Sequence, residues 1–260
     1  MSKRGVEKRY LAACAIAREA GDLMRRLYEK REMNSYKLKG HQDYLTEADG
    51  EVEKLIVQRI GEAFPEDTVF GEEGGGQFSP QVWVIDPIDG TANFARGIPH
   101  FCVSIAFVRE GQVAVGAMCN PMLGELFAAR AGAGATLNGR PMKVSNTPDM
   151  RSATVELGWS MRRPMEDYVA MLGRVVKEGA GIRRSGSGAL GLAYVADGRT
   201  DAYAELHINS WDCLAGILMV NEAGGWTNNF LANDGLVRGN PILGCNPALR
   251  EAIVKATGIG

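Results

Sequence analysis

Two aspartates, Asp86 and Asp89, stand directly after the apolar run 82–85. A short continuous apolar run is typical of a strand buried on both faces, so we expect both carboxylates where this strand leaves the core. Pro87 disfavours the helical conformation at the residue before it, and Gly90 permits a tight bend, so the two side chains can point into one cleft. Carboxylates at such short range repel each other unless a cation lies between them, and a hard divalent cation with oxygen ligands fits this pattern.

Thr91 follows Gly90 and begins a segment that predicts a short helix. The first N–H groups of a helix have no partner within the helix, so here they would face the same cleft and could bind a phosphate. Residues 86–90 are also of the types that surface turns prefer. Whether this segment is a turn or a metal site depends on further carboxylates that reach it from elsewhere in the chain.

Two other segments offer such carboxylates. Glu72 and Glu73 lie between glycines at the end of an expected strand, either as solvated loop charges or as a lid that supplies a metal ligand. Asp212 falls in the first turn of an expected helix, where the helix dipole alone favours a negative charge by about 0.3–1 kcal/mol. A carboxylate there can also reach back into a cleft at the strand ends, where open α/β sheets bind ligands.

Thr46 and Asp49 form a local pair at the start of another expected helix. A threonine that is followed three residues later by an acid is typical of a capping box. In a second interpretation, Asp49 orients a group of the site. The sequence leaves both interpretations open.

Residues 186–191 match the pattern G-x-G-x-x-G, which by itself suggests a dinucleotide-binding fold. The expected strand before it, 181–184, is short and basic, and the motif lies deep in the chain instead of opening a βαβ unit. We therefore prefer a helix start at which glycine and serine let a phosphorylated or hydroxylated substrate approach the backbone.

The surrounding sequence predicts the elements that position these residues. Apolar residues recur with a helical period over 3–30 and 46–63. Short apolar or alternating runs predict strands at 67–70 and 82–85 and antiparallel strands at 101–108, 112–118, 125–129 and 135–137. From residue 153 onward, strands (153–157, 181–184, 201–205, 225–227 and 242–244) alternate with helices (164–178, 187–196, 211–222 and one after 247). This alternation indicates a layered α/β fold.

The composition is that of an ordinary globular protein. With 260 residues, of which 45% are hydrophobic, the chain can bury a large core as one large domain or two small ones. A net charge of -2 favours a small-molecule role over direct nucleic-acid or membrane binding. The five cysteines show no C-x-x-C spacing and the N-terminus does not resemble a signal peptide, so we expect a reduced, cytoplasmic protein. The three histidines have no zinc-ligand spacing.

Taken together, three motifs in order resemble the inositol monophosphatase family of magnesium-dependent, lithium-sensitive phosphatases. They are residues 71–73, the segment 83–94 with its Asp-Pro-Ile-Asp-Gly-Thr core, and residues 211–216 with 222–225. The resemblance runs from the first expected helix to the last. It implies an α/β (α+β) fold of the layered αβαβα sandwich type in a single domain, 1–260, and usually a homodimer. Its approximate halves are 1–147, which binds metal, and 148–260, which carries the substrate pocket.

The resemblance also implies roles for individual residues. Two or three Mg²⁺ ions would be bound by Glu72, Asp86, Asp89, Asp212 and the carbonyl of Ile88. These ions would bridge the phosphate and activate a water that attacks phosphorus in line, without a covalent intermediate. Glu72 and Thr91 would position and deprotonate that water, with Asp49 hydrogen-bonded to Thr91. The substrate would contact Gly90, Thr91, Ser187, Gly188, Ala189, Glu205 and Asp212, with Lys39, Glu73, Arg184 and His207 as further candidates.

The substrate is less defined than the reaction. The loop 74–81 is shorter than in many relatives, and His207 is unusual for the pocket segment. Asn93-Phe94 resembles the inositol-phosphate branch and favours inositol 1-phosphate. Fructose 1,6-bisphosphate, histidinol phosphate and adenosine 3′,5′-bisphosphate remain alternatives. A function of another class is also open, because some bacterial relatives act as partners of the transcription or ribosomal-RNA machinery.

Overall fold

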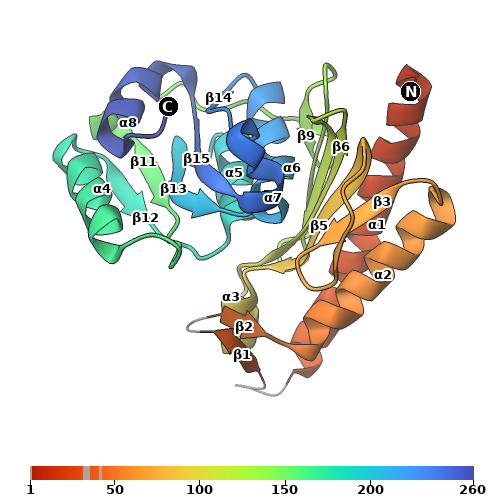
Figure 1. Ribbon diagram of the computed structural model, residues 1–260. Helices are drawn as coiled ribbons and strands as arrows, with labels where there is room; N and C mark the ends of the chain where they lie inside the picture. The colour runs from red at the N-terminus through yellow and green to blue at the C-terminus, as the bar shows by residue number, and fades with distance from the viewer. Residues whose placement is uncertain (1, 32–35, 41–42) are drawn as a thin grey trace.

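The computed structural model describes residues 2–31, 36–40 and 43–260, with the backbone alone at residues 39, 40 and 43. Helices and sheets alternate in five layers across the molecule (Figure 1). On the right of the view, helices α1 and α2 cover one sheet, and on the left α4 and α8 cover the other. Helices α5 and α6 fill the space between the two sheets. This is the αβαβα sandwich that the resemblance implies.

The α-helices of the described chain are α1 (Lys3–Lys30), α2 (Glu47–Ala63), α3 (Thr91–Arg96), α4 (Met165–Lys177), α5 (Gly188–Ala196), α6 (Ser210–Glu222), α7 (Gly235–Arg238) and α8 (Arg250–Thr257). Three short 3₁₀ helices lie at Met150–Ser152, Ala232–Asp234 and Pro247–Leu249. No helix among the described residues has the length and apolar character needed to cross a bilayer. The five cysteines, of which four are buried, form no disulfide.

The first sheet, in the spatial order β10-β9-β8-β7-β6-β5-β3-β4, takes its strands from residues 68–141. They are β3 (Thr68–Gly71), β4 (Gly75–Gly76), β5 (Gln81–Asp89), β6 (Cys102–Arg109), β7 (Gln112–Asn120), β8 (Glu125–Arg130), β9 (Ala135–Leu137) and β10 (Arg140–Pro141). The run from β5 to β10 is antiparallel throughout, as the sequence predicts for β6 to β9, whereas β3 pairs with β5 in parallel. Apart from it, β1 (Lys37–Gly40) and β2 (Asp43–Leu45) form a hairpin that the sequence does not predict.

The second sheet has the order β12-β11-β13-β15-β14. Its strands are β11 (Thr154–Leu157), β12 (Gly181–Arg183), β13 (Ala202–Ile208), β14 (Trp226–Thr227) and β15 (Asn240–Cys245). Strands β12, β11 and β13 are parallel because a helix follows β11 and another follows β12, and β15 and β14 complete the sheet antiparallel. The strands and helices therefore alternate as the sequence predicts. The division of the chain near residue 147 remains a prediction.

Strand β5 shows how the first sheet is held between two helical layers. Trp83 and Ile85 point into the core beneath α1 and α2, whereas Val82 and Val84 point into the core beneath α5 and α6. All four side chains are fully buried, because successive residues of a strand face opposite sides of a sheet. A continuous apolar run in the sequence thus corresponds to a strand covered on both faces.

The course of β5 differs from the expectation that the strand ends before Asp86. The strand continues through Pro87 to Asp89, and both aspartates are buried, with exposed fractions of 1% and 8%. The pairing with β6 shifts register between Asp86 and Asp89, so the missing N–H of Pro87 interrupts no regular ladder. Within this irregularity the N–H of Ile88 donates to Asp86 Oδ1 at 2.9 Å.

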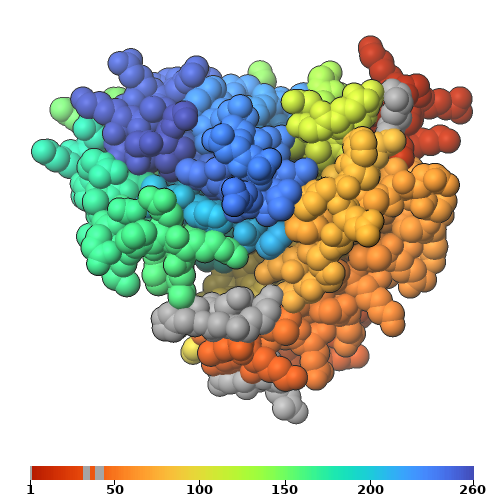
Figure 2. Space-filling model, viewed as in Figure 1, coloured from red at the N-terminus to blue at the C-terminus, as the bar shows by residue number. Residues whose placement is uncertain are grey.

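Figure 2 shows that the N-terminal part of the chain, in red and orange, and the C-terminal part, in cyan and blue, form separate areas of the surface. Strand β5 of the first sheet and the start of α6 beside the second sheet meet along the boundary between them. The motifs predicted to bind metal come from both parts of the chain, so they meet only through this packing.

Candidate metal centre

Asp86, Asp89 and Asp212 each present a carboxylate oxygen within 4.8 Å of the others. The first two come from the end of β5 and the third from the first turn of α6. Asp212 is oriented by a capping box at the start of α6, in which its Oδ2 accepts the N–H of Asn209 at 3.1 Å. Both readings of Asp212 from the sequence are therefore compatible, because the residue caps its helix and faces the other two aspartates.

Burial and mutual repulsion act together on these carboxylates. Burial raises the pKa of Asp86 well above its usual range, and the charges of Glu72, Asp212 and Asp89 raise it further. Burial, followed by the charges of Asp89 and Glu72, raises the pKa of Asp212 in the same way. Such a cluster stays ionised at neutral pH only if positive charge compensates it.

Asp89 is additionally held by the start of α5. Its carboxylate accepts hydrogen bonds from the hydroxyl of Ser187 and from the N–H groups of Gly188 (3.3 Å) and Ala189 (2.8 Å). These donors lower the pKa of Asp89 but do not offset its burial, and the value lies at about 6. The glycine-rich helix start therefore binds a carboxylate of the protein itself, whereas the sequence suggested a substrate at this place.

Glu72 follows β3 in the same edge of the sheet. Its N–H donates to the carbonyl of Ile85 at 3.2 Å, which continues the pairing of β3 with β5 by one residue. The side chain is half-buried, and its charge raises the pKa values of Asp86 and Asp212. Glu72 therefore acts on the cluster through its charge, while the three aspartates are the carboxylates that come within 4.8 Å of one another.

Thr91 and Asp49 lie beside this cluster. The Thr91 hydroxyl is 3.1 Å from Asp49 Oδ1 and 2.9 Å from the carbonyl oxygen of Ile88. Asp49 is completely buried, and its Oδ2 also accepts from the N–H (2.8 Å) and the hydroxyl (2.7 Å) of Thr46. Asp49 is therefore both a capping residue of α2 and a partner of Thr91. Burial raises its pKa, and these hydrogen bonds oppose the shift.

Gly90 joins β5 to α3 in a left-handed conformation, with φ at 102°. A Cβ atom there would come within 3.0 Å of the carbonyl oxygen of His100, so the position requires glycine on two grounds. Its neighbour Thr91 is the first residue of α3, which begins where the sequence predicts a helix.

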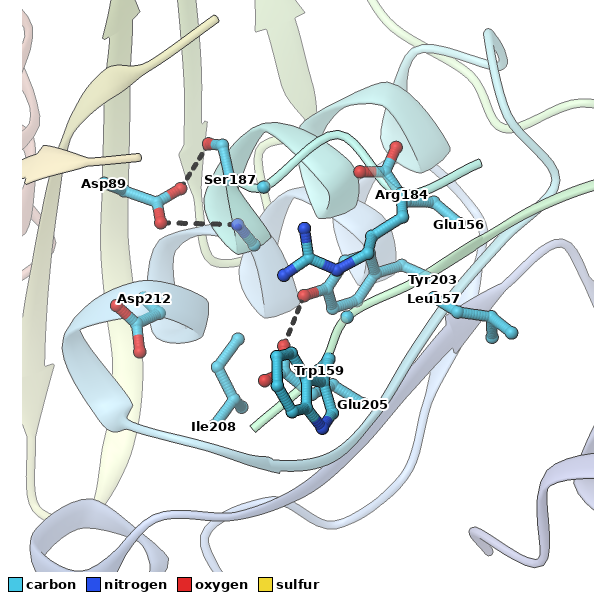
Figure 3. A pocket seen from close by; sticks show the side chains of 13 residues that line it. Asp89, Glu156, Leu157, Trp159, Arg184, Ser187, Tyr203, Glu205, Ile208 and Asp212 are labelled. Atoms are coloured by element: carbon cyan, nitrogen blue, oxygen red, sulfur yellow. Dashed lines mark hydrogen bonds between the residues drawn. The ribbon is translucent and has the colours of Figure 1, made fainter. Parts of the chain in front are cut away.

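A cavity of about 190 Å³ opens beside the aspartates (Figure 3). Asp89 and Asp212 form one end, and Glu205, Tyr203 and Trp159 lie at the other. The Tyr203 hydroxyl donates to Glu205 Oε2 at 2.6 Å. Burial raises the pKa of Glu205 to about 7, although the bond from Tyr203 lowers it.

Arg184 also lines the cavity, and Figure 3 shows its guanidinium group directed between Ser187 and Trp159. Its Cζ atom lies 5.9 Å from the centre of the Trp159 ring. Glu156 completes this wall, and one of its oxygens accepts the N–H of Ser185 at 3.0 Å. The cavity therefore combines carboxylates with a guanidinium group and suits a polar ligand.

Other candidate residues lie elsewhere or outside the described part of the chain. Ala189 is fully buried and does not line the cavity, and its N–H is directed at Asp89. His207 lies outside the cavity wall, where its Nε2 is 3.1 Å from the carbonyl oxygen of Arg238. Glu73 lies next to Glu72, and its charge raises the pKa of Asp49. The side chain of Lys39 is outside the described residues.

The donor set fits a hard divalent cation. The ligand atoms that converge are carboxylate oxygens, and the carbonyl of Ile88 is at the same irregularity of β5. Mg²⁺ prefers such oxygen donors, whereas Zn²⁺ favours cysteine and histidine. The raised pKa values of Asp86 and Asp212 point the same way, because a bound cation would compensate the charges that repel each other. The cluster could therefore hold a divalent metal ion.

Seven residues that line the cavity are absent from the predicted site residues, and three of them, Glu156, Trp159 and Tyr203, have polar or aromatic side chains. Tyr203 had a signal, because it stands two residues before Glu205 on a predicted strand and must share its face. Glu156 and Trp159 had none, since an acid within a strand and an aromatic residue after it do not indicate which cavity they will line.

The model of the inositol monophosphatase family matches residues 6–257 of the chain. Among curated proteins, the chain is 39% identical over 251 residues to a Nus factor SuhB from Pseudomonas aeruginosa, with 93% of each chain covered.

Solved structures show the same likeness. The extragenic suppressor protein suhB from Bartonella henselae matches with a TM-score of 0.88 and 36% identity, covering 95% of this chain and 96% of the other. An inositol monophosphatase from Anabaena matches with a TM-score of 0.85 and 31% identity, covering 98% of each chain.

Proposed function

Because the chain belongs to the inositol monophosphatase family, we propose that it is a Mg²⁺-dependent phosphomonoesterase that acts on a small phosphorylated alcohol, with inositol 1-phosphate as the preferred substrate. The observation that carries the proposal is the convergence of Asp86, Asp89 and Asp212 at the end of a polar cavity. Carboxylates that hold metal next to a substrate-sized cavity are the arrangement that metal-assisted phosphoester hydrolysis needs.

The proposed ligands of two or three Mg²⁺ ions are Glu72, Asp86, Asp89, Asp212 and the carbonyl of Ile88. Bound there, the ions would neutralise phosphate charge and make a water more acidic. Asp89 is supported for this role by its three donors at the start of α5, which fix the carboxylate and leave its position independent of the metal.

Thr91 and Glu72 are the proposed groups that orient the attacking water and accept its proton. The Thr91 hydroxyl can donate to Asp49 or to the Ile88 carbonyl, and its oxygen is then free to accept from a water. Asp49 supports this role from a completely buried position, because it holds the hydroxyl in one orientation.

The alcohol part of the substrate would occupy the cavity of Figure 3, with its phosphate over the N–H groups of Gly90 and Thr91. Glu205 is suited to accept hydrogen bonds from substrate hydroxyls, and Ser187 and Gly188 form the adjoining edge. A volume of about 190 Å³ is below the range of about 300–1,000 Å³ that is usual for drug-sized ligands. This size favours a single-ring alcohol.

The similarity to an inositol monophosphatase from Anabaena supports inositol 1-phosphate as the substrate. Fructose 1,6-bisphosphate, histidinol phosphate and adenosine 3′,5′-bisphosphate are the alternatives within the same chemistry. Inhibition by Li⁺, a homodimeric state and a cytoplasmic location complete the proposal.

The test is phosphate release from inositol 1-phosphate and these three alternatives, each measured with Mg²⁺, with a chelator, and with Mg²⁺ plus Li⁺. We expect release that requires Mg²⁺, is inhibited by Li⁺ and is fastest with inositol 1-phosphate. A faster alternative would change the substrate but keep the reaction. Release that is unaffected by the chelator would refute the metal-dependent mechanism.

The curated relatives favour a second candidate function, because the similar protein from Pseudomonas aeruginosa is named a Nus factor. In this role the chain would bind the transcription machinery through protein contacts, since a net charge of -2 gives no general attraction to nucleic acid. Affinity purification of the tagged chain tests the idea. Recovery of transcription proteins would support it, and recovery of the chain alone, with full phosphatase activity, would argue against it.

A further inference from the structure

Glu53 lies one helical turn after Asp49 on α2, so the two side chains leave the same face of the helix. Its exposed fraction is 8%, and none of the described residues provides a cation that forms an ion pair with it. A buried carboxylate without a cation needs hydrogen-bond donors from elsewhere. The groups that donate hydrogen bonds to Glu53 therefore indicate its structural role.

The donors are two successive backbone N–H groups of the loop that follows β3. Glu53 Oε2 accepts from the N–H of Glu73 at 3.0 Å, and Oε1 accepts from the N–H of Gly74 at 2.6 Å. Hydrogen bonds to an ionised acceptor are roughly twice as strong as neutral ones. Glu53 thus binds the loop through its backbone, irrespective of the loop side chains.

Two glycines make room for this carboxylate. A Cβ atom at Gly71 would lie 2.7 Å from Glu53 Oε2, and one at Gly74 would lie 2.6 Å from Oε1. Neither glycine has a positive φ, so backbone conformation does not require glycine at these positions. The pattern Gly-Glu-Glu-Gly at 71–74 is therefore explained by the space that Glu53 occupies.

The two residues whose N–H groups bind Glu53 directly follow Glu72 in the chain. On one side, the N–H of Glu72 donates to Ile85 of β5, and on the other the next two N–H groups donate to Glu53. The backbone on both sides of the Glu72 side chain is therefore fixed, and its charge acts on Asp86 and Asp212 from this fixed position.

We propose that Glu53 is a positioning residue that holds the loop carrying Glu72 against the metal centre and thereby increases its affinity for Mg²⁺. One helix then supports the site at two points, since Asp49 holds Thr91 and Glu53 holds the backbone next to Glu72. The inference rests on the proposed function for the identity of the metal, but the clamp itself is a property of the protein alone.

The test compares Glu53→Gln with Glu51→Gln. Glu51 lies on the same helix but is exposed, so it is a matched control for the loss of one charge. In Glu53→Gln, the amide NH₂ replaces one acceptor and must face a backbone N–H, so one of the two hydrogen bonds is lost. Hydrogen–deuterium exchange of the amides of residues 73 and 74, in chelator, should become about tenfold faster in Glu53→Gln and stay unchanged in Glu51→Gln.

The Mg²⁺ concentration for half-maximal phosphate release should rise about 10–100-fold in Glu53→Gln, the range in which groups behind a metal ligand act. The rate at saturating Mg²⁺ should fall less, since the ligands are unchanged. Gly74→Ala should have effects in the same direction, because its Cβ would occupy the place of Glu53 Oε1. In a Glu53→Ala background the same substitution should have little further effect.

Calorimetric titration with Mg²⁺ separates this inference from the proposed function. If the wild type binds Mg²⁺ but hydrolyses none of the esters, the proposed function fails, and the Mg²⁺ affinity of Glu53→Gln still decides the inference. Unchanged exchange at residues 73 and 74 in Glu53→Gln would overturn the clamp. Faster exchange with an unchanged Mg²⁺ affinity would overturn its role at the metal centre.

Discussion

Two regions of the molecule bury aspartate in opposite ways. Asp201, immediately before β13, is 6% exposed, and its two oxygens accept from the Ser145 hydroxyl at 2.5 Å and the Thr154 N–H at 2.6 Å. At the metal centre, Asp86 is 1% exposed and accepts one backbone N–H, while oxygens of Asp89 and Asp212 lie within 4.8 Å of it. The first carboxylate is surrounded by donors, whereas the second faces other carboxylates.

This is the difference expected between an acid that stabilises the fold and an acid that binds a cation. A buried carboxylate whose oxygens are matched by donors stabilises the elements it joins, because little of its solvation is left unreplaced. Carboxylates that face one another cost free energy until a cation arrives, even where one of them accepts hydrogen bonds as Asp89 does, and clusters of this kind are frequent at binding and catalytic sites. Burial alone does not distinguish the two regions.

The largest effect is expected for Asp89→Asn, which removes charge from the cluster at nearly constant shape. We expect turnover to fall roughly a thousandfold or more. The transition state loses several kcal/mol of charge stabilisation, and about every 1.4 kcal/mol lowers the rate tenfold. The far-ultraviolet circular dichroism spectrum should remain that of the wild type. Wild-type turnover with Mg²⁺ in this variant would sink the assignment of the metal centre.

Asp49→Asn tests a carboxylate that combines a structural role with one at the candidate site. Asp49 accepts hydrogen bonds from Thr46 in the capping box, and it also holds the Thr91 hydroxyl. We expect kcat to fall about 10–100-fold, as for groups that orient a reacting residue. The free energy of unfolding should also fall, by about 1 kcal/mol, from the damaged capping box. Glu47→Gln, an exposed change in the same helical turn, is the control. A loss of stability with unchanged kcat would make Asp49 purely structural.

Asp201→Asn should show the reverse pattern. One of its two donors would face an amide NH₂, so we expect the free energy of unfolding in urea to fall by about 1–3 kcal/mol. The kcat of the folded variant should not change, because Asp201 does not line the cavity. A loss of kcat without a loss of stability would break the comparison.

On the stability of the metal-free protein, Asp86→Asn should produce the smallest effect, and one of opposite sign. The raised pKa of Asp86 means that the folded, metal-free protein takes up a proton more readily than the unfolded chain. This contribution to stability is complete below the unfolded pKa of about 4 and is lost as the pH rises through the folded value.

In chelator, the melting temperature of the wild type should therefore fall as the pH is raised, and that of Asp86→Asn should fall less. At high pH the variant should be the more stable of the two, because Asn carries no charge for the buried cluster to repel. Added Mg²⁺ should stabilise the wild type more than the variant. If the melting temperatures of the wild type and Asp86→Asn changed with pH in parallel in chelator, the neighbouring carboxylates would not destabilise the charged form of Asp86.

Local sequence patterns predicted much of the fold. The helical period places α1 at Lys3–Lys30, as observed, because an amphipathic helix repeats within its own length. Thr46 and Gly90 mark the starts of α2 and α3, since caps and left-handed turns depend on neighbouring residues. The hairpin of β1 and β2 was missed, because its short polar strands carry no apolar alternation.

Residue types and their spacing predicted the acidic residues of the candidate site. Asp86, Asp89 and Asp212 were expected together, and the structure brings their oxygens within 4.8 Å. By contrast, the end of β5 was placed too early, because the sequence around Pro87 resembles a turn and only pairing with β6 extends the strand to Asp89.

Contacts between residues far apart in the chain could not be predicted from the sequence and were decided by the tertiary structure. In the sequence, Glu53 is one acid of a helix and residues 71–74 are a glycine-rich acidic loop. Neither pattern predicts that the Glu53 carboxylate fills the space beside Gly71 and Gly74. Ser187 and Asp89 are likewise joined only by the packing of α5 between the two sheets. Hydrogen bonds within a turn are specified by adjacent residues, but a long-range contact depends on how whole layers pack, and that packing distributes its energy over the entire core.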